Sequence, residues 1–271
     1  MSLNADVIVV GGGIVGASFA LQLAASDLQV VVIDRNSPAA TRLDGDFDHR
    51  VYALTPANMA LLESLDLFQP QDRARLTPIR AMEIFGDKRA TLAFSAREIN
   101  RNELAVMIEH GLLAKCLSDK LHSAGHVQCF DQSVPKSLSI GADGVSLELE
   151  DETKITAALV VGADGAKSWV RDESGFSASE KDYEQIALVA NFRCEKNHGR
   201  VARQWFADGG ILAWLPLGEN IISIVWSLPA ARAAELYALS VEEFCCAVAV
   251  GGTNTLGVMY LLSAVARFPL S

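Results

Sequence analysis

The sequence predicts an α/β protein in which a domain built on a parallel sheet is followed by a smaller α+β domain built on an antiparallel sheet. Within the first 34 residues, a valine-rich strand runs directly into a glycine-rich turn, a helix and a second valine-rich strand. A third short run, at 159–161, has the continuous hydrophobicity of a strand buried on both faces. Beyond residue 178, strand-like runs alternate with Gly, Asn and Asp, which is typical of antiparallel sheets.

Composition narrows the class of protein. The chain has 271 residues, 50% of them hydrophobic, with 23 basic and 33 acidic side chains and a net charge of −10. Since binding nucleic acid requires clustered cations, this charge argues against such a partner. No signal peptide and no uninterrupted apolar run of about 18 residues is present, so we expect a cytoplasmic protein. The five cysteines are expected to be reduced thiols; a redox disulfide between Cys245 and Cys246 is the alternative.

The N-terminal elements follow from hydrophobic pattern and turn chemistry. We expect a strand over 6–10, a turn over 11–16, a helix over 17–25 and a strand over 30–33. This length, about 30 residues, suits a βαβ unit that binds a dinucleotide.

The rest of the chain separates into helical and strand patterns. Helices are predicted over 58–67 and 103–121, and residues 79–94 are predicted to form a hairpin that turns at Gly86-Asp87. Period-two alternation over 127–161 indicates further strands. The predicted domains are 1–178, with a small hairpin insertion at about 76–98, and 179–271. The predicted strands of the second domain are 186–194, 204–206, 211–215 and 221–226.

The glycine-rich turn fits the pattern G-x-G-x-x-G of a Rossmann-like domain. Gly11 permits a tight turn, Gly13 lets a pyrophosphate approach the backbone, and Gly16 allows close packing of helix on strand. The helix N-terminus then faces the phosphates. Asp34 lies 21 residues after Gly13, where a carboxylate can accept hydrogen bonds from ribose hydroxyls. The alternative is a glycine-rich turn that binds no nucleotide.

A second motif, Gly162-Ala163-Asp164-Gly165, follows the third valine-rich run. Its carboxylate would lie at the carboxyl end of a strand, where ligands of open α/β sheets bind. By spacing alone, the motif could be only a strand end with an Asx turn. Its sequence, however, resembles the Asp-Gly fingerprint of the flavin-dependent aromatic hydroxylases of the p-hydroxybenzoate hydroxylase-like class. Together with the N-terminal motif, this resemblance implies FAD rather than NAD as the tightly held cofactor.

Further segments resemble the ubiquinone-biosynthesis hydroxylases within that class, over essentially the whole chain. Residues 48–54 are similar to the family's Arg-x-x-Ala-Leu segment, and 268–270 to the segment before its final flavin motif. The segments 201–204, 215–217 and 223–227 are similar to its substrate-domain strands. The resemblance implies an FAD-binding domain over 1–178 and a substrate domain over 179–271. It also implies hydroxylation of a polyprenylphenol.

The resemblance also implies roles for individual residues. The expected cofactor-binding residues are Gly11, Gly13, Gly16, Asp34, Arg35, Arg50, Asp164 and Gly165. Arg50 would reach the pyrophosphate or the flavin edge, unless it is a solvated surface residue. Asp164 and Gly165 would contact the ribityl-pyrophosphate region. Arg171 is expected mainly to form a structural ion pair at a helix start.

No catalytic side chain is assigned, because the chemistry belongs to the flavin. By resemblance, NAD(P)H reduces FAD, and one oxygen atom of O2 is transferred to a polyprenylated phenol or quinol. The five histidines form no convincing metal site, so none is predicted. The aromatic side chains of Trp205, Phe206, Trp214 and Trp226 are interpreted as half-buried sheet residues or, alternatively, as a pocket lining.

The chain departs from the family pattern at two places. Glu109-His110-Gly111 stands where the family often has Glu-Asn-Arg, so an expected cofactor-contacting Arg is missing. The family's C-terminal Gly-Asp motif is also missing, which predicts a C-terminally truncated chain without the return to the FAD-binding domain. The main hypothesis is therefore an FAD monooxygenase. The alternatives are a catalytically incomplete fragment, a scaffold subunit of the ubiquinone pathway, or an FAD-linked reductase.

The expected partners follow from the substrate class. They are the polyprenylated substrate, O2 and other ubiquinone-pathway proteins, without nucleic acid. Because the chain has no polybasic cluster, we expect at most peripheral contact with the inner face of the membrane.

Overall fold

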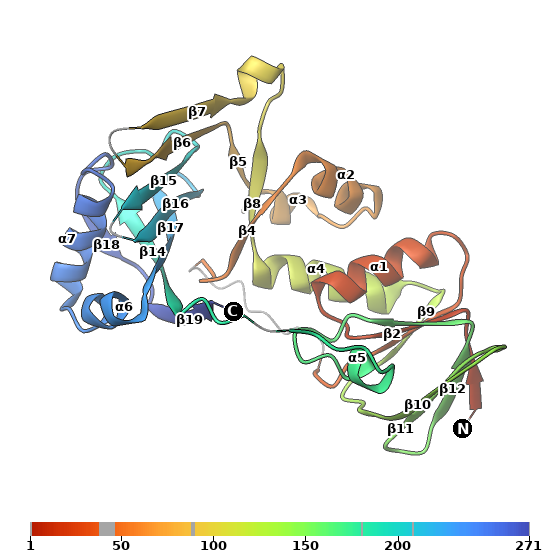
Figure 1. The fold of residues 1–271 in the computed structure, drawn as a ribbon. Coiled ribbons are helices and arrows are strands. Elements are labelled where there is room, and N and C mark those ends of the chain that lie inside the picture. The colour runs from red at the N-terminus through yellow and green to blue at the C-terminus, as the bar shows by residue number, and fades with distance from the viewer. Residues whose placement is uncertain (1, 38–46, 88–89, 180, 208, 271) are drawn as a thin grey trace. The chain divides into compact units, whose positions relative to one another are not determined.

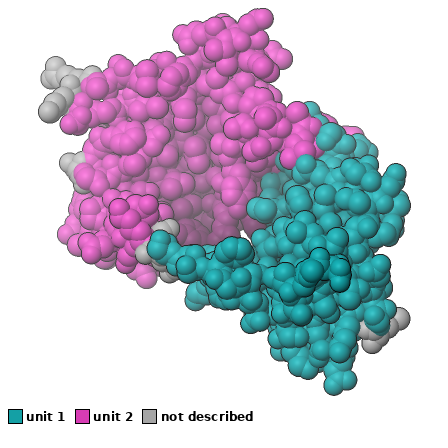
Figure 2. All heavy atoms as spheres, turned by 45° about the vertical axis from the view of Figure 1, so that its right-hand side comes forward, with its two compact units in different colours: residues 1–42, 62–68, 111–179 teal, residues 43–61, 69–110, 180–271 magenta. Residues whose placement is uncertain are grey.

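The computed structural model describes residues 2–37, 47–87, 90–179, 181–207 and 209–270. The chain divides into two compact units, each assembled from separate stretches of sequence (Figure 2). Unit 1 contains residues 1–42, 62–68 and 111–179, and unit 2 contains 43–61, 69–110 and 180–271. No helix of the described residues is long and apolar enough to cross a membrane.

Unit 1 is built around a parallel sheet of four strands in the order β13-β2-β3-β9. The central strands β2 and β3 are buried along their whole length, as their runs of Val and Ile predict. Helices α1 and α4 lie on one face of this sheet (Figure 1). The bounds are Val7–Val10 for β2, Ile14–Ala24 for α1, Val30–Ile33 for β3, His110–Ser123 for α4, Val127–Phe130 for β9 and Leu159–Gly162 for β13.

A second sheet covers the other face of the parallel sheet. Its order is β1-β12-β11-β10, and β10 and β11 join at Gly141 and Gly144. Ile8 and Val31 of the parallel sheet share one buried cluster with Leu147 of this sheet. The remaining elements of unit 1 are β1 (Ser2–Asn4), β10 (Pro135–Gly141), β11 (Gly144–Leu149), β12 (Lys154–Ala157) and α5 (Trp169–Glu173).

Unit 2 contains a large mixed sheet in the order β18-β14-β17-β16-β15-β6-β7, with β19 also paired to β14. The four long strands predicted beyond residue 178 are confirmed. They are joined to the predicted hairpin of β6 and β7 through the parallel pair of β15 and β6. The bounds are Ala81–Phe85 (β6), Thr91–Ser95 (β7), Gln185–Cys194 (β14), Val201–Ala207 (β15), Gly210–Leu217 (β16), Ile221–Pro229 (β17), Met259–Leu261 (β18) and Ala266–Leu270 (β19).

Two helices pack on one face of this sheet, α6 (Ala230–Tyr237) and α7 (Val241–Gly251). Phe244 and Val248 of α7 pack with Trp205 and Trp214 of the sheet in one buried cluster. Trp205 and Trp214 are therefore core residues, 6% and 1% exposed, rather than pocket residues.

A third sheet corrects two sequence predictions. Residues 103–109 were expected to begin a helix, but β8 (Ala105–Glu109) is a strand that pairs with β4 (Val51–Leu54) on one side and β5 (Thr77–Ile79) on the other. The helical prediction was wrong because pairing with distant segments overrides a local periodicity. Ile79 belongs to β5 and not to the hairpin. The other elements of this region are α2 (Pro56–Ser64), α3 (Pro70–Arg73) and the 3-10 helix Ala96–Ile99.

The third valine-rich run also differs from expectation. β13 is the edge strand of the parallel sheet, with Leu159 51% exposed, rather than a strand buried on both faces. Its two valines, Val160 and Val161, are only partly buried.

The end of α7 supplies a test of the unit 2 core. A Cβ at Gly252, the C-cap residue, would overlap the indole ring of Trp214. We expect Gly252→Ala to destabilise the chain by about 1–3 kcal/mol, because overpacking forces a buried ring to move. The melting temperature should fall by about 2–4 °C per kcal/mol. Gly125→Ala is the control, since a Cβ there has no atom within 4 Å. Equal melting temperatures for the two variants would contradict this packing.

Candidate cofactor site

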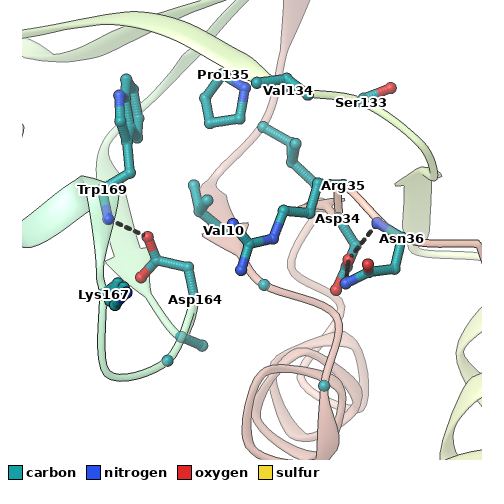
Figure 3. Close-up of a pocket in the computed structure, with 15 residues that line it drawn as sticks. Val10, Asp34, Arg35, Asn36, Ser133, Val134, Pro135, Asp164, Lys167 and Trp169 are labelled. Carbon is teal, nitrogen blue, oxygen red and sulfur yellow. Dashed lines mark hydrogen bonds between the residues drawn. The ribbon is translucent and has the colours of Figure 1, made fainter.

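The carboxyl ends of β2, β3 and β13 meet at a pocket of about 380 Å³ in unit 1. Gly11 follows β2, Asp34 follows β3, and Asp164 follows β13, so the two predicted motifs line one cavity (Figure 3). Six of the eight expected cofactor-binding residues lie in its wall: Gly11, Gly13, Asp34, Arg35, Asp164 and Gly165. Their contact with a cofactor stays a prediction. Ligands of open α/β sheets bind at this edge.

The glycine-rich turn has backbone geometry that other residues would not permit. Gly11 has φ +105°, and a Cβ there would overlap the carbonyl of Ala163. A Cβ at Gly16, in α1, would overlap the carbonyl oxygen of Gly11. By contrast, a Cβ at Gly13 would have no atom within 4 Å, so the pocket is open above this residue. Gly13 is also the N-cap of α1 and supplies no side-chain cap, which leaves the first N–H groups of the helix for a ligand.

The carboxylate of Asp34 accepts hydrogen bonds from the glycine-rich turn and from the loop that follows β3. Its Oδ2 accepts a hydrogen bond from the N–H of Gly12 at 2.6 Å. Its Oδ1 accepts from the backbone N–H of Asn36 at 2.7 Å and from the Asn36 side chain at 3.0 Å. A carboxylate has about four acceptor positions, so three bonds leave room for one more donor, such as a ribose hydroxyl.

The two carboxylate oxygens of Asp164 differ in their hydrogen bonds. Oδ2 accepts hydrogen bonds from the N–H groups of Trp169 and Val170, at 2.6 and 3.2 Å. Oδ1 is buried and has no partner among the described residues. Since a buried acceptor without a donor is costly, this oxygen fits a ligand hydroxyl. The free helix N–H groups, the open space above Gly13 and this acceptor together fit the phosphates and hydroxyls of FAD.

Other residues of the pocket were missed by the sequence analysis. Lys167 and Trp169 lie in the wall, shortly after the second motif, but no role was predicted for them. The segment 133–135, which leads into β10, also lines the pocket. Its sequence carries no local signal, because hydrogen bonds to residues about 100 positions away bring it there: the N–H of Ser133 donates to the carbonyl of Asp34, and the N–H of Gln132 to that of Asn36. Figure 3 shows the Arg35 side chain extending into the pocket from beside Asp34.

Arg171 has a structural role. Its Nη1 donates to the carbonyl of Ala166 at 2.8 Å, and its Nε pairs with Asp172 at 3.0 Å. This confirms the expectation of an ion pair at a helix start.

Arg50 lies in unit 2, where its guanidinium carbon is 5.6 Å from the centre of the Phe268 ring. The carbonyl of Arg50 accepts a hydrogen bond from the N–H of His110, and the hydroxyl of Tyr52 lies 3.0 Å from Nδ1 of His110. Contact between Arg50 and a flavin stays a prediction.

Among the described residues, no group of three His, Cys, Asp or Glu side chains could hold a metal ion. The pocket and the motifs around it define a class of protein, the flavoproteins that hold FAD on a Rossmann-like sheet. The model of the family described as FAD binding domain matches residues 4–235.

Individual relatives make the assignment more specific. The chain is 32% identical over 266 residues to the 3-demethoxyubiquinol 3-hydroxylase of Escherichia coli, covering 98% of this chain and 68% of that protein. It is 27% identical to the ubiquinone hydroxylase UbiM of Neisseria meningitidis, covering 100% of this chain and 59% of that protein. The chain therefore belongs to the ubiquinone-biosynthesis family of FAD-dependent hydroxylases.

Solved structures confirm the fold. PqsL of Pseudomonas aeruginosa, described as a probable FAD-dependent monooxygenase, matches with a TM-score of 0.75 at 20% identity, over 96% of this chain and 73% of that one. The flavin-dependent halogenase CmlS matches with a TM-score of 0.73 at 18% identity, over 98% of this chain and 50% of that one.

The environment of His110 yields a test. Burial, and secondly the nearby Arg50 cation, lower the pKa of His110, while Asp48 raises it. We expect Arg50→Gln to raise the pKa of His110, because the variant removes the repulsion that disfavours the imidazolium. An NMR titration of the His110 ring would measure the shift, with Arg232→Gln on α6 as control. An unchanged pKa of His110 in Arg50→Gln would contradict the arrangement.

Proposed function

We propose that this chain binds FAD in the pocket of unit 1 and hydroxylates the aromatic ring of a ubiquinone precursor, using NAD(P)H and O2. The observation that carries the proposal is that Asp34 and Asp164 line one pocket together with the glycine-rich turn. The N-terminus of α1 there has no side-chain cap. When bound, FAD supplies the redox chemistry of oxygen transfer. The residues of the chain bind and orient it.

Each pocket residue has a role that suits its chemistry. The N–H groups at the start of α1 would bind the pyrophosphate, since the positive end of the helix dipole favours anions. Asp34 would accept from a ribose hydroxyl. Asp164 would repel a phosphate, so its buried Oδ1 is better matched to a hydroxyl of the ribityl chain. Arg35 and Gly165, in the same wall, would contact the cofactor as well.

An apolar substrate agrees with the surface of the large sheet in unit 2. Strand alternation places Leu92 and Phe94 of β7 and Phe206 of β15 on the face opposite α6 and α7. They remain 52%, 43% and 42% exposed. Exposed apolar side chains that share one face often mark a binding surface. This face supports a substrate with a hydrophobic tail, such as a polyprenylated phenol.

Such a substrate lies in lipid, so the proposal includes peripheral contact with the membrane and with other ubiquinone-pathway proteins. The net charge of −10 opposes attraction to anionic lipid, so this contact would depend on the apolar substrate or on partner proteins.

The direct experiment uses the purified 271-residue chain supplied with FAD, NAD(P)H, oxygen and a short-chain prenylphenol. We expect the flavin absorption band to stay with the protein after gel filtration, and isotopic oxygen from O2 to appear in the product. If the chain neither binds FAD nor oxidises NAD(P)H, the proposed hydroxylase activity is contradicted. That result would favour a role as a scaffold subunit of the ubiquinone pathway. NAD(P)H oxidation with substrate reduction but no oxygen incorporation would indicate a reductase instead.

Two glycine variants separate binding from folding. Gly13→Ala adds a methyl group in open space, so we expect FAD affinity to fall at least about tenfold (about 1.4 kcal/mol) with a small change in melting temperature. Gly16→Ala places a methyl group on the carbonyl of Gly11, so this variant should lose stability even without FAD. Fluorescence titration and thermal melts of the apo-protein would measure both effects. Unchanged FAD affinity in Gly13→Ala would contradict the assignment of the pyrophosphate site.

A further inference from the structure

Four arginines that are far apart in the sequence lie together in unit 2, at one end of the hairpin of β6 and β7. The N–H of Arg80, the residue before β6, donates to the carbonyl of Arg200, the residue before β15, at 2.8 Å. The carbonyl of Arg80 accepts at 2.9 Å from the N–H of Ala96, which begins the 3-10 helix after β7. Arg97 is the next residue of that helix, and the N–H of Arg101 donates to the carbonyl of Ala96 at 2.8 Å. Arg80, Arg97, Arg101 and Arg200 are named here the arginine cluster.

The arginine cluster is exposed, and its charge is not neutralised nearby. None of its four members has an acidic partner in the part of the chain that the structure describes. By contrast, Arg203 on β15 is paired with Glu83 at 2.7 Å. The carboxylate of Glu98, in the 3-10 helix, accepts a hydrogen bond from the N–H of Ser95 at 3.0 Å. The cluster is therefore a local concentration of positive charge in a chain whose net charge is −10.

Exposed apolar side chains lie beside the arginine cluster. Leu92 and Phe94 belong to β7, which is the edge strand of its sheet (Figure 1). Ile99, at the end of the 3-10 helix, is 61% exposed. Phe94 pairs with Met82, and Arg80 lies two residues before Met82, so strand alternation places Arg80 on the face that carries Phe94. Cations and hydrocarbon thus share one surface of unit 2.

We infer that the arginine cluster, together with Leu92, Phe94 and Ile99, is a docking surface for a membrane that contains anionic lipid. Guanidinium groups bind phosphate oxygens in pairs of hydrogen bonds, and apolar side chains enter the boundary between headgroups and acyl chains. A membrane offers phosphates and hydrocarbon side by side, which matches both features of this surface. The choice of lipid as the partner rests on the proposed function, in which the substrate lies in lipid.

The net charge of the chain opposes attraction at long range but does not prevent this docking. Charges separated by more than the Debye length, about 8 Å at physiological ionic strength, are largely screened. The membrane therefore responds to the charges that reach its surface and not to the sum over the chain. The sequence shows no polybasic run, because strand pairing brings residues 80, 97, 101 and 200 together.

Flotation of the full chain with lipid vesicles tests the inference. One set of vesicles contains equal amounts of phosphatidylcholine and phosphatidylglycerol, and the other contains phosphatidylcholine alone. We expect the chain to bind the anionic vesicles more tightly, and added salt to weaken this binding by screening. Arg97→Gln combined with Arg101→Gln should weaken it about thirtyfold (about 2 kcal/mol), at about 1 kcal/mol for each arginine near an anionic surface.

A matched control removes the same charge from the opposite face of the sheet. Arg232 lies on α6, and the guanidinium carbon of Arg267 lies 4.4 Å from the ring centre of Tyr237 on the same helix. Arg232→Gln combined with Arg267→Gln should leave vesicle binding nearly unchanged. Equal losses from the two double variants would show that only the net charge matters, which would overturn the inference.

Phe94→Thr tests the apolar part of the surface without a change in charge. Thr also favours strands, so the hairpin should be kept, and melting temperatures would verify this. We expect vesicle binding to fall about tenfold, because less apolar surface is buried in the lipid. If this variant does not fold, the exposed arginines still carry the test.

The outcomes that overturn the inference are distinct from those that overturn the proposed function. A wild-type chain that does not bind anionic vesicles, or binds neutral vesicles equally well, would overturn the docking surface, while FAD binding measured without vesicles would stand. Soluble polyglutamate that competes fully with the vesicles would assign the surface to an acidic protein instead. A chain that binds anionic vesicles through these arginines but binds no FAD would overturn only the proposed function.

Discussion

The pocket of unit 1 depends on a single steric constraint, the contact of three backbone segments at the glycine-rich turn. The carbonyl of Gly11 occupies the space that a Cβ of Gly16 would need, and the carbonyl of Ala163 occupies that of Gly11. This contact places the start of α1 and the ends of β2 and β13 together. Asp34 and Asp164 thereby reach the same cavity from strands far apart in the sequence. A methyl group at either glycine would overlap backbone atoms of this contact.

The two carboxylates of the pocket illustrate how one chemical group serves two purposes. Asp34 is nearly saturated by hydrogen bonds from Gly12 and Asn36, so it mainly shapes the loop that receives the ligand. Asp164 holds the start of α5 with one oxygen, and its other oxygen is buried without a partner in the part of the chain that the structure describes. An unpaired buried acceptor lowers stability, and a ligand donor would recover that free energy on binding.

The departure from the family at Glu109-His110-Gly111 has a structural counterpart. The sequence lacks an arginine at position 111, but Glu109 is not left without a cation, because Arg75 reaches it from the segment after α3. The pair lies in unit 2 and supports the segment that contains Arg50. The chain spans 68% of the E. coli relative and 59% of UbiM, and the elements that carry this arrangement all lie within the matched length.

The sequence by itself determined the βαβ unit, both glycine-containing motifs, the spacing of Asp34 and the antiparallel strands of unit 2. These features depend on local rules: the period of hydrophobic residues, the backbone freedom of glycine, and the number of residues between the glycine-rich turn and Asp34. Only the tertiary structure decided that 105–109 is the strand β8, that β13 is an edge strand and that the segment 133–135 completes the pocket. It alone also joined Arg75 to Glu109. Strand pairing and buried hydrogen bonds join residues tens or hundreds of positions apart, and no local pattern records which partner a segment will meet.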